Sequence, residues 1–198
     1  MSVSPTSLSK YLQTLINLDI LEREVPVTEK NSEKSKKGQY KIKDNFIAFW
    51  FQFIYPNKAF LEMGQEQVVL NKIKKNFIDN NVSFVYEDVC REKMWELNAE
   101  GKLGMSFDKL GRWWNQDQEI DIVGVDTTGE DIIFGECKYY TNKQMDAKVF
   151  YELQSKAKLV DWKKEKRKET YILFSISGYT EELTEIAKKR NDLILIFI

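Results

Sequence analysis

Two short segments of the sequence carry charged side chains whose types and spacing suit a divalent cation. Glu-Ile-Asp-Ile-Val at residues 119–123 alternates polar and apolar side chains, and Gly-Glu-Cys-Lys follows at residues 135–138. Two carboxylates held about 3–5 Å apart repel each other unless a cation neutralises them. Oxygen ligands suit Mg²⁺ or Mn²⁺, and a neighbouring ammonium group can hold and polarise a water molecule. The two segments therefore predict a cation site built from Asp121, Glu136 and Lys138.

The order of residues within each segment predicts where each side chain points, because successive side chains of a strand face opposite sides of the sheet. Asp121 is expected to share a face with Glu119 and to point away from Ile120 and Ile122. On the second strand, Cys137 is expected to point into the core. A hairpin between the two strands would then bring the acidic side chains together.

A surface ion pair is the alternative interpretation of these residues. Glu-x-Lys tripeptides are common, and an exposed pair between Lys138 and Glu136 or Asp121 would contribute only about 0–1 kcal/mol. The aspartate on a paired strand, the apolar residues of both strands and the order of helices and strands favour the cation site.

The composition excludes several other kinds of chemistry. The chain has 198 residues, no histidine and two cysteines, so Ser-His-Asp catalysis, Cys-His catalysis and histidine-ligated zinc are ruled out. Cys90 and Cys137 are too few for a four-cysteine zinc site and are expected to be reduced thiols. The sequence has neither a signal peptide nor the roughly 20 apolar residues of a membrane span, so a soluble, cytoplasmic protein is expected.

The second half of the sequence alternates segments typical of helices and strands. Strands are expected at residues 102–114, 119–125, 132–139, 170–177 and 193–198, with a turn at 126–129. Helices are expected from residue 83 and over 145–162 and 179–190. The first of these helices is expected to bury Phe84, Val85, Val89, Met94 and Leu97. The resulting order is α-β-β-β-α-β-α-β.

The first half begins with a helix capped at Ser4, whose apolar face, including Leu8 and Tyr11, is expected to face a core. Strands follow at 20–27 and 40–43 around a lysine-rich loop. Helix, strand, loop and strand resemble the back half of a winged helix, so the chain is expected to begin inside such a module. Residues 44–55 predict a buried helix capped by Asp44. A helical stretch over 60–78 would end in a turn at 79–81.

The residues of the predicted cation site are similar to the PD-(D/E)xK motif of restriction-endonuclease-like nucleases, whose core also has the order α-β-β-β-α-β. Ile120 stands where that motif usually has proline. The resemblance implies that Asp121, Glu136 and the backbone carbonyl of Cys137 bind Mg²⁺ or Mn²⁺. It also implies that Lys138 assists the water that attacks phosphorus.

An acidic residue on the first core helix often completes such a site. Tyr-Glu-Asp at residues 86–88 resembles this part of the motif, so Glu87 is the candidate for catalysis or metal binding, and Glu92 is the alternative. We therefore expect an α/β, restriction-endonuclease-like fold over residues 76–198. A partial winged helix over 1–43 and a helical linker over 44–75 would precede it.

A second resemblance covers nearly the whole chain. The C-terminal region of archaeal-type AAA/P-loop ATPases, in which a winged helix precedes a nuclease-like domain of unknown function, is similar to this sequence. The similar segments are residues 10–15, 40–50, 55–57, 86–87 and 135–138. The sequence contains no G-x-x-x-x-G-K-[S/T] motif of its own. The resemblance therefore implies a fragment or a truncated relative, with an ATPase domain or a full-length ATPase as a partner.

Segregated charges suggest DNA as a further partner. Basic residues gather at 28–43 and 156–168, around an acidic centre at 87–131, although ordinary solvated faces would give the same pattern. The candidate DNA contacts are Lys10, Gln13, Lys34, Lys36, Lys37, Lys163 and Lys164.

Aromatic residues gather at two further places. Trp113 and Trp114 are adjacent on a strand, so at most one would stack on a base, and burial of both is the commoner outcome. Phe49, Trp50, Phe51 and Phe53 are expected to form a packing cluster or, alternatively, an interface of a homo-oligomer.

These observations predict a Mg²⁺-dependent endo- or exodeoxyribonuclease that hydrolyses phosphodiester bonds. A DNA-binding or assembly module that has a nuclease-like fold without turnover is the alternative. A pure protein-interaction domain is a third interpretation, and it predicts no salt-sensitive affinity for DNA.

Overall fold

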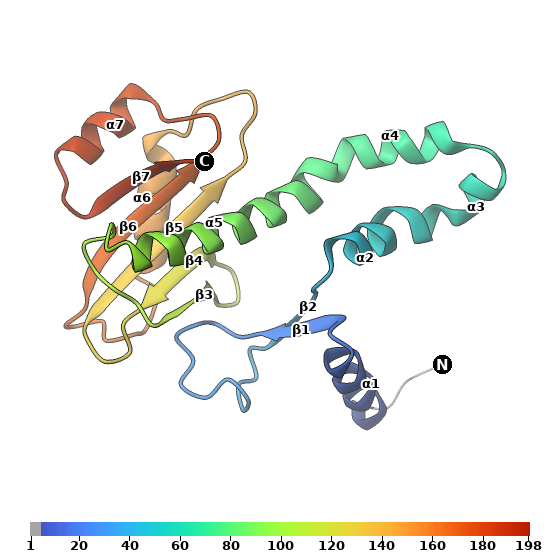
Figure 1. Ribbon diagram of the computed structural model, residues 1–198, viewed down its shortest axis with the longest axis horizontal. Coiled ribbons are helices and arrows are strands. Elements are labelled where there is room, and N and C mark those ends of the chain that lie inside the picture. Colours follow the sequence, from blue (N-terminus) through green and yellow to red (C-terminus); the bar gives the residue numbers. More distant parts are fainter. Residues whose placement is uncertain (1–4) are drawn as a thin grey trace. The chain divides into compact units, whose positions relative to one another are not determined.

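The computed structural model describes residues 5–198, with all side chains except those of residues 5, 6, 79 and 80 (Figure 1). The chain forms two compact units. The first contains the residues up to Val25 and Lys36–Val82, and the second contains Pro26–Ser35 and Ser83–Ile198. The cap predicted at Ser4 lies outside the described residues. The domain boundaries predicted from the sequence stay predictions.

In the first unit, a helix is followed by a two-stranded antiparallel hairpin, as the sequence predicts. The elements are α1 (Pro5–Asn17), β1 (Leu21–Glu24) and β2 (Gln39–Ile42). The expectation that the apolar face of α1 is covered is wrong for Leu8 and Tyr11, which are exposed. The assignment of these elements to a winged helix stays a prediction.

The helix predicted over residues 44–55 forms, but the expectation that it is buried is wrong. Asp44 caps α2 (Asn45–Phe49) by accepting the N–H of Ile47 at 2.8 Å. The chain continues as a π-helical turn, η1 (Trp50–Ile54), and a 3₁₀ turn, η2 (Tyr55–Asn57). Phe46 is 70% exposed, whereas Phe53 is buried. The reason is that the described residues cover one face of this segment, where Phe53 packs against Phe49 and Phe77.

The helical stretch predicted over residues 60–78 is interrupted and continues beyond its predicted end. Its break lies at Gly64, which has a φ of 69° and separates α3 (Lys58–Glu62) from α4 (Glu66–Phe77). The turn predicted at residues 79–81 is wrong, because a π-helical turn, η3 (Ile78–Val82), leads directly into α5 (Ser83–Ala99).

The second unit is built on a five-stranded mixed sheet of order β3-β4-β5-β6-β7. The strands are β3 (Lys109–Trp114), β4 (Glu119–Val125), β5 (Asp131–Lys138), β6 (Lys168–Ser175) and β7 (Leu193–Phe197). Neighbours from β3 to β5 are antiparallel, and β5, β6 and β7 are parallel. All five predicted strands are therefore confirmed, with shifted ends.

The first of these strands starts later than predicted. Residues 102–108 are irregular because the side chain of Asn98 accepts the N–H of Phe107 and donates to its carbonyl, both at 3.1 Å. These two bonds take the place of pairing with a neighbouring strand. Leu103 and Phe107 consequently turn inward and extend the core.

Helices cover both faces of the sheet (Figure 1). One hydrophobic cluster joins the sheet to α5, and the other joins it to α6 (Ala147–Ala157) and α7 (Glu181–Lys188). The buried face of α5 includes Tyr86, Cys90 and Met94, whereas Phe84 and Val89 are exposed, contrary to expectation. The fold is thus a mixed α/β sandwich in which Cys90 and Cys137 are free, buried thiols. No helix within residues 5–198 is long and apolar enough to cross a membrane.

Candidate active site

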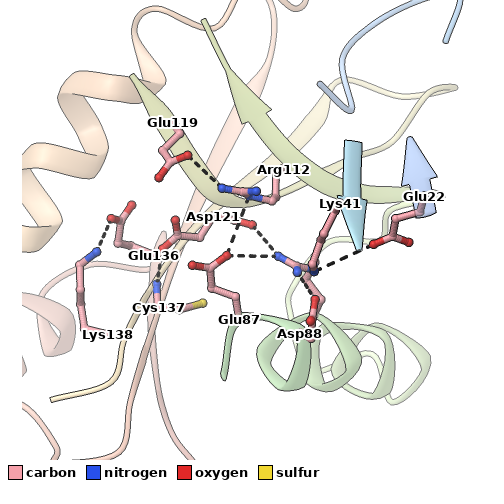
Figure 2. Close-up of polar contacts among 11 residues, drawn as sticks. Glu22, Lys41, Glu87, Asp88, Arg112, Glu119, Asp121, Glu136, Cys137 and Lys138 are labelled. Carbon is pink, nitrogen blue, oxygen red and sulfur yellow. Dashed lines mark hydrogen bonds and ion pairs between the residues drawn. The ribbon is translucent and has the colours of Figure 1, made fainter. Parts of the chain in front are cut away.

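Neighbouring strands bring two acidic side chains together at the edge of the core of the second unit. Asp121 is near the start of β4 and Glu136 is near the end of β5. The pairing of Ile122 with Gly135 places the two acidic residues beside each other, as Figure 2 shows. Asp121 is 5% exposed and Glu136 is 4% exposed. Two carboxylates therefore share one buried region, which is costly unless basic groups or a cation compensate their charge.

A β-bulge sets the direction of Asp121. The register of β3 and β4 shifts so that Asp121 and Ile122 together lie opposite Arg112. Ile120 consequently packs with α6 and Ile122 packs with α5, on opposite faces of the sheet. The prediction that Asp121 points away from both isoleucines is therefore wrong. The bulge instead lets Oδ2 of Asp121 accept the backbone N–H of Cys137 at 3.0 Å.

Two lysine side chains hold Glu136. Lys138, on the same strand, donates to Oε1 of Glu136 at 2.7 Å. Lys156, on α6, donates to Oε1 and Oε2 at 3.0 and 3.1 Å. Glu136 thus accepts hydrogen bonds from two ammonium groups. Together with Asp121, the centre contains two acidic and two basic side chains.

Burial changes the proton affinity of these groups. It raises the pKa of Asp121 to about 6, and the negative charge of Glu136 adds to the increase. Burial lowers the pKa of Lys138, but Glu136 and Asp121 outweigh this effect and raise it overall. Lys138 is therefore a stable cation beside the two acids at neutral pH.

Glu87 reaches the same region from α5, but two arginines surround it (Figure 2). Oε2 of Glu87 lies 3.7 Å from Nη1 of Arg91 and 3.9 Å from Nε of Arg112. Burial raises the pKa of Glu87 to about 7, with a further contribution from the charge of Asp121, while the two arginines oppose the shift. The alternative candidate, Glu92, is exposed on the same helix. Glu87 is therefore placed to influence Asp121 electrostatically.

The donors present fit a hard divalent cation in kind. The carboxylates of Asp121 and Glu136 and the carbonyl of Cys137 all supply oxygen. Among the side chains that the structure describes, no group of three or more acidic or cysteine residues is arranged to hold a metal ion. A cation at this centre would rely on two carboxylates, the carbonyl and water, and it would compete with the lysines for Glu136.

Two basic residues of this centre, Lys156 and Arg91, were not predicted from the sequence. Lys156 follows Val149 by seven residues and Leu153 by three, so helical spacing alone places it on the covered face of α6. A charged residue on the covered face of a helix indicates a buried partner of opposite charge, so this spacing could have identified Lys156. Arg91 follows Glu87 by four residues, the spacing of an ion pair along a helix.

One of the predicted DNA contacts of the second unit has other partners in the structure. Lys163 donates to the carbonyls of Thr127 and Gly129, at the opposite end of β4 and β5 from Asp121. The remaining candidates are all exposed. They are Lys34 and Lys164 in the second unit, and Lys10, Gln13, Lys36 and Lys37 in the first. Their role in DNA binding stays a prediction.

Both tryptophans of β3 belong to the interior. Trp113 and Trp114 are buried, and Trp113 packs in the cluster that joins the sheet to α6. Neither indole ring is therefore presented as a surface on which a base could stack, in agreement with the commoner outcome expected from the sequence.

Comparisons with known proteins place the chain in a family. It is 41% identical over 156 residues to an uncharacterized protein of Methanocaldococcus jannaschii, MJECL04, and the match covers 78% of this chain and 34% of that relative. The chain thus spans about a third of the relative's length. The crystal structure of a repair endonuclease from Pyrococcus abyssi is similar with a TM-score of 0.34 and 16% identity, over 54% of this chain and 45% of that one. Residues 50–150 match DUF234, and the chain belongs to this family, described as archaea bacterial proteins of unknown function.

Proposed function

We propose that the second unit is a Mg²⁺-dependent nuclease domain that hydrolyses phosphodiester bonds of DNA. The observation that carries the proposal is the buried pair Asp121 and Glu136 on neighbouring strands, with Lys138 bonded to Glu136 at 2.7 Å. The order of helices and strands around this pair agrees with the restriction-endonuclease-like core expected from the sequence. The proposal extends the observed mixed α/β architecture to an activity.

Each residue of the centre has a task in this proposal. A bound Mg²⁺ supplies a Lewis acid that polarises a phosphoryl oxygen. Asp121, Glu136 and the carbonyl of Cys137 would hold the cation, and the N–H of Cys137 fixes the orientation of Asp121. Lys138 stays protonated and would orient the attacking water and meet negative charge that develops on the phosphate. Arg91 orients the segment through its hydrogen bond to the carbonyl of Asp121 at 3.4 Å.

A cleavage assay with matched variants tests this proposal. Supercoiled and linear DNA are incubated with Mg²⁺ or Mn²⁺ and the wild-type protein, Asp121→Ala, Lys138→Ala or the control Lys158→Ala, which changes an exposed lysine at the C-terminal cap of α6. We expect nicking by the wild type and the control, and a loss of about 10²-fold or more in the other two variants. Equal nicking by all four proteins would identify a contaminant and contradict the proposal.

A DNA-binding or assembly module without turnover is the second candidate function. The bonding of both oxygens of Glu136 by lysines favours it, because this arrangement compensates the charge without a cation. Salt-sensitive binding of DNA without cleavage under Mg²⁺, Mn²⁺ and added ATPase partner would support this module over the nuclease.

The resemblances also propose contacts for the first unit. Its α1 and the part of the lysine-rich loop that belongs to this unit, with Lys36 and Lys37, would bind DNA as part of a winged helix, and an ATPase domain would be its partner. Removing a phosphate contact in this unit, for example by Lys36→Ala, would weaken DNA binding without abolishing cleavage by the second unit. Unchanged DNA affinity would contradict this contact.

A further inference from the structure

Lys156 is a basic residue on the covered side of a helix. Its carbon chain follows the face of α6 that includes Val149 and Leu153, and its side chain is 20% exposed. The ammonium group ends within hydrogen-bond distance of both oxygens of Glu136, at 3.0 and 3.1 Å. An ion pair of this kind offsets part of the cost of burying the carboxylate.

The same lysine also borders a groove on the surface of the second unit. The groove has a volume of about 950 Å³ and follows α6, where Tyr151, Ser155 and Leu159 line it together with Gln118. Besides Lys156, the charged residues that line the groove are Asp146, Lys148, Glu152 and Glu182. Asp146 caps α6, and Lys148 lies 3.7 Å from Glu152. Lys156 thus lies between the acidic centre and the groove.

A divalent cation and Lys156 would compete for the same oxygens. Like charges repel, so a cation bound by Asp121 and Glu136 would weaken the attraction between Glu136 and the ammonium group. Lys138 differs from Lys156 in its position, because it lies on the same strand as Glu136, whereas Lys156 reaches Glu136 from α6. The long, flexible side chain of Lys156 can turn toward the groove by rotation about its own bonds.

We infer that Lys156 is an exchangeable counter-ion, which neutralises Glu136 when no cation is bound and binds a phosphate of the DNA strand in the groove once a cation takes its place. The inference rests on the proposed function and specifies how the centre loads its cation. Lys156 is a positioning residue toward the metal ion and a contact residue toward the substrate. Its removal therefore affects the two ligands in opposite directions.

Binding of Mn²⁺ alone tests the first half of the inference. Free Mn²⁺ is measured by electron paramagnetic resonance during titration of the wild type, Lys156→Met, Lys156→Arg and Lys158→Met, which changes an exposed lysine at the C-terminal cap of α6. Loss of a charge-assisted competitor should tighten Mn²⁺ binding by about tenfold in Lys156→Met. Lys156→Arg retains the charge, so its affinity should return toward that of the wild type, and Lys158→Met should match the wild type. A purely structural role for Lys156 would weaken Mn²⁺ binding instead.

Binding of DNA tests the second half. A fluorescent duplex and a single strand of the same sequence are titrated in Ca²⁺, with affinity measured by anisotropy at several salt concentrations. Lys156→Met should weaken binding several-fold and reduce the salt slope by about one unit, and Lys158→Met should change neither.

The outcomes separate this inference from the proposed nuclease activity. Unchanged or weaker Mn²⁺ binding by Lys156→Met, or DNA affinity equal to that of the wild type, overturns the inference even if the wild type cleaves DNA. The expected changes in both ligands, without cleavage by any variant, support the inference and reject the hydrolytic function.

Discussion

At the scale of single residues, the two acids of the candidate site are compensated unequally. Glu136 receives hydrogen bonds from Lys138 and Lys156, whereas Asp121 accepts the backbone N–H of Cys137. A full positive charge compensates a buried carboxylate better than a peptide dipole does. Burial and, after it, the negative charge of Glu136 raise the pKa of Asp121 to about 6, although Lys138 and Lys156 oppose the shift. The charge of Asp121 is therefore costly in the absence of a cation.

Replacing Asp121 by asparagine is expected to stabilise the cation-free protein. The folded state raises the pKa of Asp121 from 3.8 to about 6, so this carboxyl favours folding below pH 4 and loses that contribution as the pH rises through 6. Asp121→Asn cannot ionise and still offers an oxygen to the N–H of Cys137. At pH 7.5, its free energy of unfolding should exceed that of the wild type by about 2 kcal/mol, with the difference vanishing near pH 4. Urea denaturation in EDTA between pH 4 and 8 measures it.

A matched control and added cation sharpen this test. Asp117→Asn changes an exposed aspartate in the turn before β4, so its stability should follow that of the wild type at every pH. Saturating Mg²⁺ should stabilise the wild type and leave Asp121→Asn nearly unchanged, because the cation binds the ionised form. A wild type that is more stable than Asp121→Asn at pH 7.5 in EDTA would show that the carboxylate is already well compensated.

At the scale of elements, local sequence patterns predict the strands but not the way in which they meet. Residues 119–125 and 131–138 are rich in apolar residues and are joined by a short turn, so their pairing and the approach of Asp121 to Glu136 could be predicted. The bulge at Asp121 could not, because it depends on the register with β3. Lys156 contacts Glu136 across the long connection to α6, and only the covered face of that helix hinted at its role.

The tight approach of strands below the site makes Gly135 a sensitive position. A Cβ atom there would lie 2.9 Å from Cβ of Ile122 and 2.9 Å from Cγ2 of Ile172. Gly135→Ala should therefore lower the free energy of unfolding by about 2 kcal/mol, because buried side chains must shift. It should also weaken Mn²⁺ binding, since Ile122 adjoins Asp121 in the bulge. Urea denaturation and the Mn²⁺ titration measure the two effects.

Gly111 provides the comparison for this substitution. A Cβ atom at Gly111 would lie 3.2 Å from Cβ of Val27, a contact that a small shift relieves. Gly111→Ala should cost less than half as much stability as Gly135→Ala and leave Mn²⁺ affinity intact. Equal stability of the two variants would mean that the side chains around Gly135 shift at little cost. The close approach of Ile122 and Ile172 to Gly135 would then not constrain the site.

At the scale of the whole molecule, the sequence predicts which segments are apolar helices better than it predicts which of their side chains are buried. The cap at Asp44 and the nearly continuous apolar run of residues 44–55 identify a helix rich in aromatic residues, but they do not say what covers each face. Within the described chain, Phe53 is covered, whereas Phe46, Trp50 and Phe51 are exposed. The two-unit division also depends on contacts distant in sequence, such as the hydrogen bond from the N–H of Val27 to the carbonyl of Arg112 at 2.9 Å.

From the exposed aromatic residues of the first unit, we predict that the protein binds a hydrophobic dye in solution. Apolar side chains that are exposed together bind hydrophobic dyes and promote association. The native chain should therefore enhance the fluorescence of 8-anilinonaphthalene-1-sulfonate, and the double variant Phe46→Ser, Phe51→Ser should reduce that enhancement by roughly half. Its free energy of unfolding should stay within about 0.5 kcal/mol of the wild-type value, because neither ring is buried. Phe53→Ser, which changes a buried ring, should instead destabilise the protein by about 3 kcal/mol. Unchanged dye fluorescence in the double variant, or a loss of stability as large as that of Phe53→Ser, would mean that these rings are covered in solution, as the interface of a homo-oligomer would require.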